Sequence, residues 1–270
     1  MMIAELIFKI VIENSVYAKG AFREPRPSEI VQRFGKCKMA NELPDTIDLY
    51  SWNMLTGLKK DWLKGFKDYS SKTNLFLLQE TFFNEAQKKN FNDSLFCWTA
   101  GNAHVHIKTN VPSGVATGAF AKPLKTEVTY SKYYEPVMWV RQATLYSWFK
   151  IKKSQKPLLV VNVHAINFVP DYMYFEQIAN IEKKIRKHNG PVIIAGDFNT
   201  FSLSKTKFVN LLVKKHKLKE VEFLNDKRKK FRAFPLDHIY VRGFNIVESQ
   251  VEDSSLSSDH NALWTRLKLQ

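Results

Sequence analysis

Glycine and cysteine are scarce in this sequence, with ten glycines and two cysteines in 270 residues. No glycine-rich run of the Walker type is present, which excludes a P-loop nucleotide hydrolase. A G-x-S-x-G motif is also missing, and this argues against a serine hydrolase built on a nucleophile elbow. No apolar run is long enough to cross a bilayer. The sequence therefore indicates neither a P-loop protein nor a membrane-spanning one.

The two cysteines, Cys37 and Cys97, form no C-x-x-C pair. Their number and spacing argue against a zinc ribbon and against a disulfide scaffold. We therefore expect two separate buried thiols.

The first residues, MMIAELIFKIVIENSVYA, resemble a weak export signal. Glu5, Lys9 and Glu13 interrupt the apolar stretch, so we expect a short amphipathic helix instead. Residues 3–12 of such a helix would be able to lie on an anionic membrane surface. A cytoplasmic location in a bacterium is the expectation, with export as the alternative.

Positive charge is in excess: the formal net charge is +15 and the pI is about 9.6. Residues 205–232 carry eleven Lys or Arg and three acids, which is more than half of the excess. A basic balance of this size indicates a polyanionic partner, either nucleic acid, a phosphoinositide or an anionic membrane surface. No obligate protein partner is indicated.

The order of apolar and amphipathic segments predicts one α/β domain of packed sheets flanked by helices. Residues 1–46 read as a proline-containing lead-in, partly helical or irregular, and 47–270 as the domain. We expect strands over 47–53, 75–79, 114–121, 143–151, 158–165, 192–196, 236–243 and 262–269. We expect helices over 58–70, 174–190 (ending at Gly190) and 205–216. Residues 158–196 then form a strand–helix–strand unit.

Polar residues follow the apolar runs at several strand ends: Asn53, Glu80, His164, Asp197, Asn199, Asp237, Asp259 and His260. Taken singly, each has an ordinary structural explanation as a turn residue, a helix cap or a structural histidine. Taken together, they indicate a site, because strand ends in α/β proteins converge on one edge of a sheet.

These residue types limit the chemistry. Glu80 with Asn53 or Asp259 supplies hard oxygen ligands that suit Mg²⁺ or Mn²⁺. Histidines beside carboxylates suit proton transfer and the binding of an oxyanion. The combination predicts metal-assisted attack of water on a phosphate ester. His104 and His106 would share one strand face, but two ligands do not make a metal site.

The motifs WNM, QE, NVHAINF, GDFNT, LDHIY and SSDHNAL occur in this order between residues 47 and 270. In this order they resemble the endonuclease/exonuclease/phosphatase superfamily, which has the DNase I-like fold. The segments NVHAINF and PLDHIYVRG are similar in sequence to the bacterial YafD-like branch of this superfamily. The resemblance implies a four-layer α/β sandwich, two packed mixed sheets flanked by helices.

The resemblance implies a role for each matching residue. Glu80 would bind the divalent metal, Asn53 would help position metal and phosphate, and Asp259 would lie near the metal. Asp197 would orient or deprotonate the attacking water. Asn199 would steady the phosphate and the nucleophile.

Three further roles follow from the same resemblance. His260 would hydrogen-bond a phosphoryl oxygen, and Asp237 would pair with that histidine. His164 would lie on the leaving-group or phosphate side. Members that repair abasic sites carry a tyrosine in that region, so such an activity is disfavoured.

Substrate contacts are expected from two regions. Arg141 would reach a phosphate, although a surface salt bridge explains it equally well, and Asn167 would shape the pocket. A basic loop precedes the LDH motif and would contact a phosphate backbone, where a solvated charge run is the alternative. This basic loop comprises Lys227, Arg228, Lys229, Lys230 and Arg232.

The function predicted from these features is a Mg²⁺- or Mn²⁺-dependent nuclease acting on DNA. The alternative is a phosphatase for phosphoinositides or inositol phosphates, or a sphingomyelinase-like phosphodiesterase. A catalytically inactive binding module is the least expected, because every catalytic position is occupied by a competent residue type.

Overall fold

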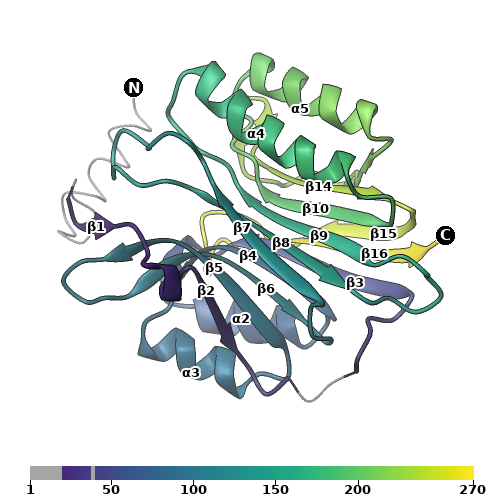
Figure 1. Ribbon diagram of the computed structural model, residues 1–270, viewed down its shortest axis with the longest axis horizontal. Coiled ribbons are helices and arrows are strands. Elements are labelled where there is room, and N and C mark those ends of the chain that lie inside the picture. Colours follow the sequence, from purple (N-terminus) through teal and green to yellow (C-terminus); the bar gives the residue numbers. More distant parts are fainter. Residues whose placement is uncertain (1–19, 38–39) are drawn as a thin grey trace.

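The computed structural model describes residues 20–37 and 40–270. Two β-sheets pack face to face, and a pair of helices covers the outer face of each sheet (Figure 1). This is the predicted four-layer α/β sandwich. The amphipathic helix expected over 3–12 lies outside the described residues. Within the described chain, no helix is both long and apolar enough to cross a membrane.

The first sheet has eight strands in the order β1-β5-β6-β4-β3-β16-β15, with β2 also paired to β5. Their bounds are Phe22–Arg23 (β1), Val31–Phe34 (β2), Thr46–Asn53 (β3), Leu75–Phe82 (β4), Cys97–His106 (β5), Pro112–Ala119 (β6), Phe244–Val251 (β15) and Leu263–Leu269 (β16). β3 and β4 run parallel and the other pairs antiparallel, so the sheet is mixed. β1 and β2 come from the expected lead-in, which thus contributes to the main sheet.

The second sheet has the order β11-β14-β10-β9-β8-β7. Its strands are Lys125–Tyr130 (β7), Ala143–Phe149 (β8), Leu158–His164 (β9), Val192–Asp197 (β10), Lys219–Glu220 (β11) and Asp237–Arg242 (β14). A separate hairpin joins Lys230–Phe231 (β12) and Phe234–Pro235 (β13). β9 and β10 are parallel neighbours on either side of a helix in sequence, so the predicted strand–helix–strand unit is confirmed.

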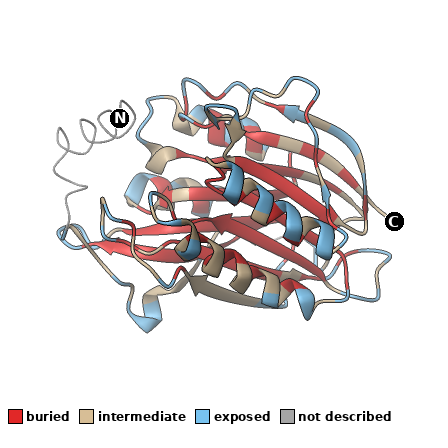
Figure 2. Cartoon of the chain, turned by 90° about the horizontal axis from the view of Figure 1, so that it is seen from above, coloured by how far each residue is buried: buried red, intermediate tan, exposed pale blue. Residues whose placement is uncertain are grey.

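Helices α2 (Trp62–Ser70) and α3 (Glu85–Asp93) cover the first sheet, and α4 (Asp171–Arg186) and α5 (Leu203–Lys215) cover the second. Two short 3-10 helices span Pro27–Glu29 and Leu55–Gly57. The helix expected over 174–190 ends earlier, because the amide of Lys187 turns back to the carbonyls of Lys184 and Ile185. Gly190 is therefore not its C-cap. Figure 2 shows the helices buried toward the sheets and exposed on their outer faces.

The inner core lies between the two sheets, where Leu49 and Leu77 meet Val160, Ile193 and Ile239. All five are fully buried. A side chain of this kind contributes on the order of 1.5–3 kcal/mol when it leaves water. The sandwich therefore holds the polar strand ends on a rigid support.

The two cysteines correct an expectation. Cys37 and Cys97 form a disulfide, with their Cα atoms 4.4 Å apart, and are not free thiols. The pairing depends on β2 lying antiparallel to β5, where Phe34 is opposite Trp98. A spacing of 60 residues in sequence does not reveal this register.

Candidate active site

Seven of the predicted residues meet at one edge of the sandwich: Asn53, Glu80, His164, Asp197, Asn199, Asp237 and His260. Strand register explains much of this, because Asp197 is directly opposite His164 on one side and Asp237 on the other. Asp237 begins its strand and does not end it. β14 runs antiparallel to β10, so its first residue reaches the same edge.

Asp197 lies at the centre of the cluster. Its Oδ1 accepts a hydrogen bond from the amide of Asn199 (2.9 Å), and its Oδ2 accepts one from Nδ2 of Asn53 (3.1 Å). The side chain is almost completely buried. Burial and the carboxylate of Asp237 raise the pKa of Asp197 above its usual range. A carboxylate tuned in this direction is suited to accept a proton near neutral pH.

Gly196 allows Asp197 its position. A Cβ atom at Gly196 would lie 2.0 Å from the carbonyl oxygen of Val163, and the residue has a φ of +141°. Only glycine fits such a close approach of two strands. β10 can therefore place Asp197 beside His164 at the end of β9.

Glu80 occupies a β-bulge in β4. The register of β4 against β6 shifts between Leu78 and Thr81, and Glu80 has a φ of +52°. A non-glycine residue in this region costs on the order of 1–3 kcal/mol, and such strain concentrates at functional sites. The bulge directs the carboxylate to Asn53, whose Nδ2 donates to Glu80 Oε1 (2.8 Å).

His260 and Asp237 form a buried pair, with Nδ1 of the imidazole 2.7 Å from Oδ2 of the carboxylate. The other ring nitrogen, Nε2, is 4.0 Å from Oδ2 of Asp197. Burial alone would lower the pKa of His260. The carboxylates of Asp237, Asp197 and Asp259 outweigh that effect and raise the pKa to about 10. The ring is therefore an imidazolium at neutral pH.

His164 faces the same centre from β9. Its Nε2 lies 3.8 Å from Oε1 of Glu80 and 3.9 Å from Oδ2 of Asp197. Burial lowers the pKa of this histidine. Asp197 thus lies between His260, whose pKa is raised, and His164, whose pKa is lowered.

Buried polar groups outside the predicted set hold these residues in place. Ser258 donates to the carbonyl of Asn53 (2.7 Å), and the indole of Trp52 donates to the carbonyl of His260 (3.1 Å). Gln79 donates to Asn162 across the two sheets (2.8 Å). Ser258 and Gln79 are next to predicted residues in the SSDH and QE motifs, and this position is the sequence signal that could have identified them. Nothing in the sequence marks Asn162 as an inter-sheet partner.

Asp259 lies at the exposed rim, where Lys229 Nζ is 3.3 Å from its Oδ2. The basic loop is close to this point, because Asn261 also donates to the carbonyl of Lys227 (2.8 Å). Lys227, Lys230 and Arg232 are exposed.

Arg228 differs from the rest of the basic loop. Its guanidinium binds Asp226 (2.8 Å) and Glu220 (3.1 Å), and its side chain is 10% exposed. These contacts direct it inward, to the side chains that surround His238. The structure therefore does not bring Arg228 to the surface with its neighbours.

Arg141 and Asn167 each contact an acid that is not one of the predicted site residues. Arg141 pairs with Glu24 (Nη2 to Oε1, 3.0 Å), and the amide of Asn167 donates to Oε1 of Glu135 (2.8 Å). Glu135 is a buried acid that no sequence motif marks. Burial raises its pKa to about 8, and it is close enough to Glu80 and Asp197 for their charges to add to the shift.

The cluster fits a divalent cation. Oxygen or nitrogen atoms of Glu80, His164 and Asp197 all lie within 4.8 Å of one another, as do those of Asp197, Asp237 and His260. Closely spaced buried carboxylates repel each other unless a positive charge lies between them. Hard oxygen donors of this kind favour Mg²⁺ or Mn²⁺ over softer metals.

Two mixed sheets with paired carboxylates and histidines at one edge define the DNase I-like phosphoester hydrolases. A model of the Endonuclease/Exonuclease/phosphatase family matches residues 50–260, and the chain belongs to this family. A UPF0294 protein of Vibrio parahaemolyticus is 30% identical over 219 residues, which cover 80% of this chain and 76% of that protein. The closer likeness to the YafD-like branch stays a prediction.

Solved structures agree on the fold. An endonuclease/exonuclease/phosphatase from Bacteroides vulgatus superposes with a TM-score of 0.63 at 16% identity, over 83% of this chain and 99% of that chain. The mannosyl-6-phosphatase Bt3783 of Bacteroides thetaiotaomicron gives a TM-score of 0.59 at 17% identity, over 82% and 99% of the two chains. At these identities the likeness establishes the architecture.

Proposed function

We propose that the chain is a divalent-metal-dependent phosphodiesterase that cleaves nucleic acid, with DNA as its substrate. The observation that carries the proposal is the meeting of Glu80, Asp197 and the His260–Asp237 pair at one edge, beside the basic loop. A phosphate ester placed there would meet a base, an imidazolium and cation ligands at once.

Asp197 is the base in this proposal. Its two oxygens are held by the amide of Asn199 and the carboxamide of Asn53, so the carboxylate has one orientation. It would align an attacking water and accept its proton. Its raised pKa lies nearer to the working pH, so Asp197 accepts a proton more readily than an ordinary aspartate does.

Glu80, Asn53 and Asp259 would hold Mg²⁺ or Mn²⁺. When bound, the cation supplies neutralisation of the phosphate charge. Nε2 of His260 would donate a hydrogen bond to a phosphoryl oxygen as negative charge develops there. Asp237 keeps that ring charged and oriented. One preorganised donor of this type is worth about 10²–10³ in rate.

The basic loop supports nucleic acid over a small phosphate ester. Lys227 is exposed, and its carbonyl accepts a hydrogen bond from Asn261, next to Asp259 and His260; Arg232 is exposed in the same loop. Cations on this rim would contact phosphates flanking the scissile one, and such contacts bind a backbone without sequence preference.

A substrate panel tests the proposal. Purified protein with Mg²⁺ or Mn²⁺ is assayed on plasmid DNA, RNA, inositol phosphates and sphingomyelin. We expect cleavage of DNA that is lost in Asp197→Asn and retained in Asp93→Asn, a matched change at an exposed carboxylate on α3. Activity confined to inositol phosphates or sphingomyelin would overturn the nuclease assignment. Cleavage that persists in Asp197→Asn would overturn the assignment of the base.

A further inference from the structure

A second histidine of β14, His238, lies next to the catalytic cluster and has no part in the reaction proposed above. Asp237 and His238 are consecutive in this strand, so their side chains point to opposite faces of the sheet. Asp237 faces the catalytic cluster, where it binds His260. His238 points to the face that α4 and α5 cover (Figure 1), and its ring stacks on that of Tyr240 at 5.4 Å. It is 4% exposed.

Both ring nitrogens of His238 have polar partners inside the protein. Nδ1 lies 2.8 Å from Oε1 of Glu220, and Nε2 lies 2.8 Å from Oγ1 of Thr200. Thr200 is 1% exposed, and its hydroxyl donates to the carbonyl of Pro235 (2.6 Å). A carboxylate of β11, an imidazole of β14 and a hydroxyl beyond β10 therefore form one continuous chain of polar contacts.

Thr200 ends the catalytic segment, residues 197–200, which begins at the last residue of β10. The first residue of the segment is the proposed general base, Asp197. His238 packs edge-on against the ring of Phe198 (5.7 Å between centroids) and contacts the hydroxyl of Thr200. The imidazole therefore holds the catalytic segment at two points, close behind the carboxylate of Asp197.

The basic loop is held by the same glutamate. Oε1 of Glu220 accepts a hydrogen bond from Nη1 of Arg228 (3.1 Å) and also lies beside His238. Nη1 of Arg228 donates to the carbonyl of Asp237 as well (3.2 Å). Nε and Nη2 bind the two carboxylate oxygens of Asp226 (2.8 and 3.0 Å). Arg228 thus anchors the loop to the protein, and its exposed neighbours are the cations available to a phosphate backbone.

We infer that His238 is a positioning residue that joins the basic loop to the catalytic segment. We call the group of Thr200, Glu220, Arg228 and His238 the histidine clamp. Through Thr200 the clamp fixes the segment that carries Asp197, and through Arg228 it fixes the cations that bind flanking phosphates. A backbone bound by the loop then presents its scissile phosphate at one distance from Asp197, and a displacement of about 1 Å can cost 10²-fold in rate. This role rests on the proposed nuclease function and deepens it.

A second pair in the molecule separates positioning from simple stabilisation of the fold. Nε2 of His216 lies 2.8 Å from Oε1 of Glu182 at the C-terminal end of α5. α5 has 13 residues and begins just after the catalytic segment, so this pair lies about 20 Å away along the helix. A substitution at His216 therefore measures the effect of losing a histidine–carboxylate pair that does not adjoin the site.

The first test separates kcat from KM. Thr200→Val keeps the shape of the side chain and removes the hydroxyl. We expect it to lower kcat on plasmid DNA about 10- to 100-fold and to leave KM unchanged, because the loop cations stay in place. His216→Asn should keep the wild-type kcat. A wild-type kcat in Thr200→Val would overturn the positioning role, and so would an equal loss of kcat in His216→Asn.

The second test measures the salt dependence of DNA binding by anisotropy in an Asp197→Asn background. Arg228→Met should flatten the logarithmic slope, because the loop loses its anchor. It should have no further effect once the other four cations of the basic loop are alanine. A further loss of about 0.9 in that background would mean that Arg228 itself binds a phosphate, and this would overturn the inference. An unchanged slope in Arg228→Met alone would also overturn it. Arg242→Met, at another inward-directed arginine, is the matched control.

Limited digestion with trypsin tests the histidine clamp without a substrate. Arg228→Met should speed cleavage at the remaining basic residues of the loop, because local opening becomes easier, and Arg242→Met should not. Equal digestion rates in the wild type and Arg228→Met would overturn the clamp and leave the nuclease intact. Faster digestion of Arg228→Met, with a wild type that neither binds nor cleaves DNA, would overturn the nuclease and leave Arg228 as the anchor of the loop.

Discussion

Nδ1 of His260 lies 2.7 Å from Oδ2 of Asp237, and this contact determines what the other face of the ring can do. The carboxylate fixes the ring orientation and keeps a proton on each nitrogen. Nε2 then points toward Asp197, 4.0 Å away, where the substrate phosphate would lie. Asp237, at the start of β14, thus positions Nε2 of His260, which lies in the loop before β16.

The first prediction concerns this pair. Asp237→Asn should lower the rate about 10²–10³-fold, because the variant loses the charged donor aimed at the phosphate. The carboxylate raises the pKa of His260, so its removal should shift the basic limb of the pH–rate profile to lower pH. A pH profile of kcat/KM measures both effects. If His260→Ala and the double variant are equally slow, the two residues act as a unit.

The second prediction concerns the cation. Glu80→Gln should weaken Mn²⁺ binding, because a charged ligand becomes a neutral one at the same place. Isothermal titration calorimetry with Mn²⁺ measures this independently of activity. Glu85→Gln, at an exposed position five residues later, is the matched control. Unchanged Mn²⁺ affinity in Glu80→Gln would remove Glu80 from the ligand set.

The third prediction uses the buried acid Glu135. Its folded-state pKa of about 8 lies above the ordinary value of 4.5, so the folded state retains a proton that the unfolded chain releases. The free energy of unfolding should therefore fall as pH rises from about 4.5 to 8, by up to about 1.4 kcal/mol per pH unit. Glu135→Gln should lose this slope. Urea unfolding at several pH values checks it, and parallel curves for both proteins would contradict it.

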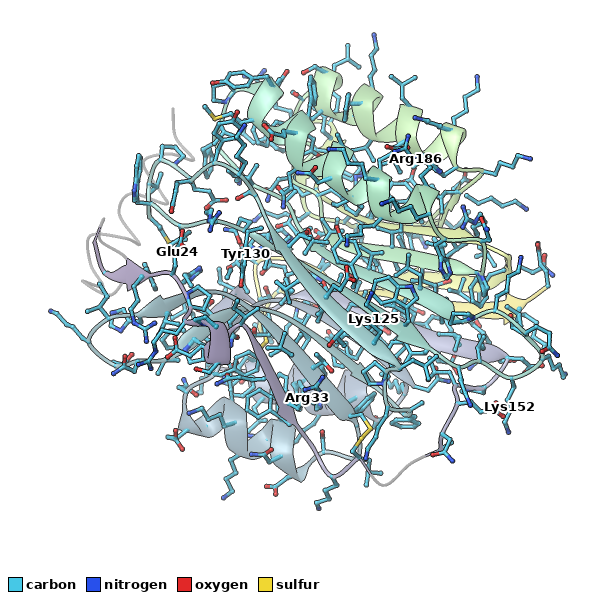
Figure 3. All side chains as sticks on the ribbon, viewed as in Figure 1. Glu24, Arg33, Lys125, Tyr130, Lys152 and Arg186 are labelled. Carbon is cyan, nitrogen blue, oxygen red and sulfur yellow. A yellow bond between two sulfur atoms is a disulfide. The ribbon has the colours of Figure 1, made fainter. Side chains whose placement is uncertain are left out.

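The fourth prediction concerns the basic loop. Lys227→Ala with Arg232→Ala should flatten the salt dependence of DNA binding, by about 0.9 in the logarithmic slope for each lost phosphate contact. Binding is measured by anisotropy in an Asp197→Asn background. Lys152→Ala with Arg186→Ala is the control, because both cations lie near the opposite strand ends (Figure 3). Equal slopes for the two double variants would contradict the assignment.

The fifth prediction concerns the disulfide between Cys37 and Cys97. It closes a 60-residue loop, so its reduction should lower the free energy of unfolding by about 4 kcal/mol. Thermal unfolding with and without reductant measures the loss, and a Cys37→Ser, Cys97→Ser variant should not respond to reductant. Because the cytoplasm keeps thiols reduced, an intact bond in freshly fractionated cells would favour the export alternative.

Much of the site was predictable because its residues follow strong strands. Runs such as VIIAG and LLVVNV have the β-branched, continuously apolar character of strands buried on both faces. The polar residue after each run then stands out. β5 and β15 lack such a signal, since CWTAGNAHVH mixes small and polar residues and β15 is largely exposed. β15 went unpredicted, and of β5 only the end that carries His104 and His106 was read as a strand.

By itself, the sequence predicted one α/β domain of packed sheets flanked by helices, because periodicity is a local property. The four-layer sandwich followed from the ordered motifs that resemble the family, and the same motifs marked the seven residues that meet at one edge. Tertiary structure decided the rest. The bulge that turns Glu80 toward Asn53, the disulfide that follows β2–β5 pairing and the burial of Arg228 all depend on register between distant segments.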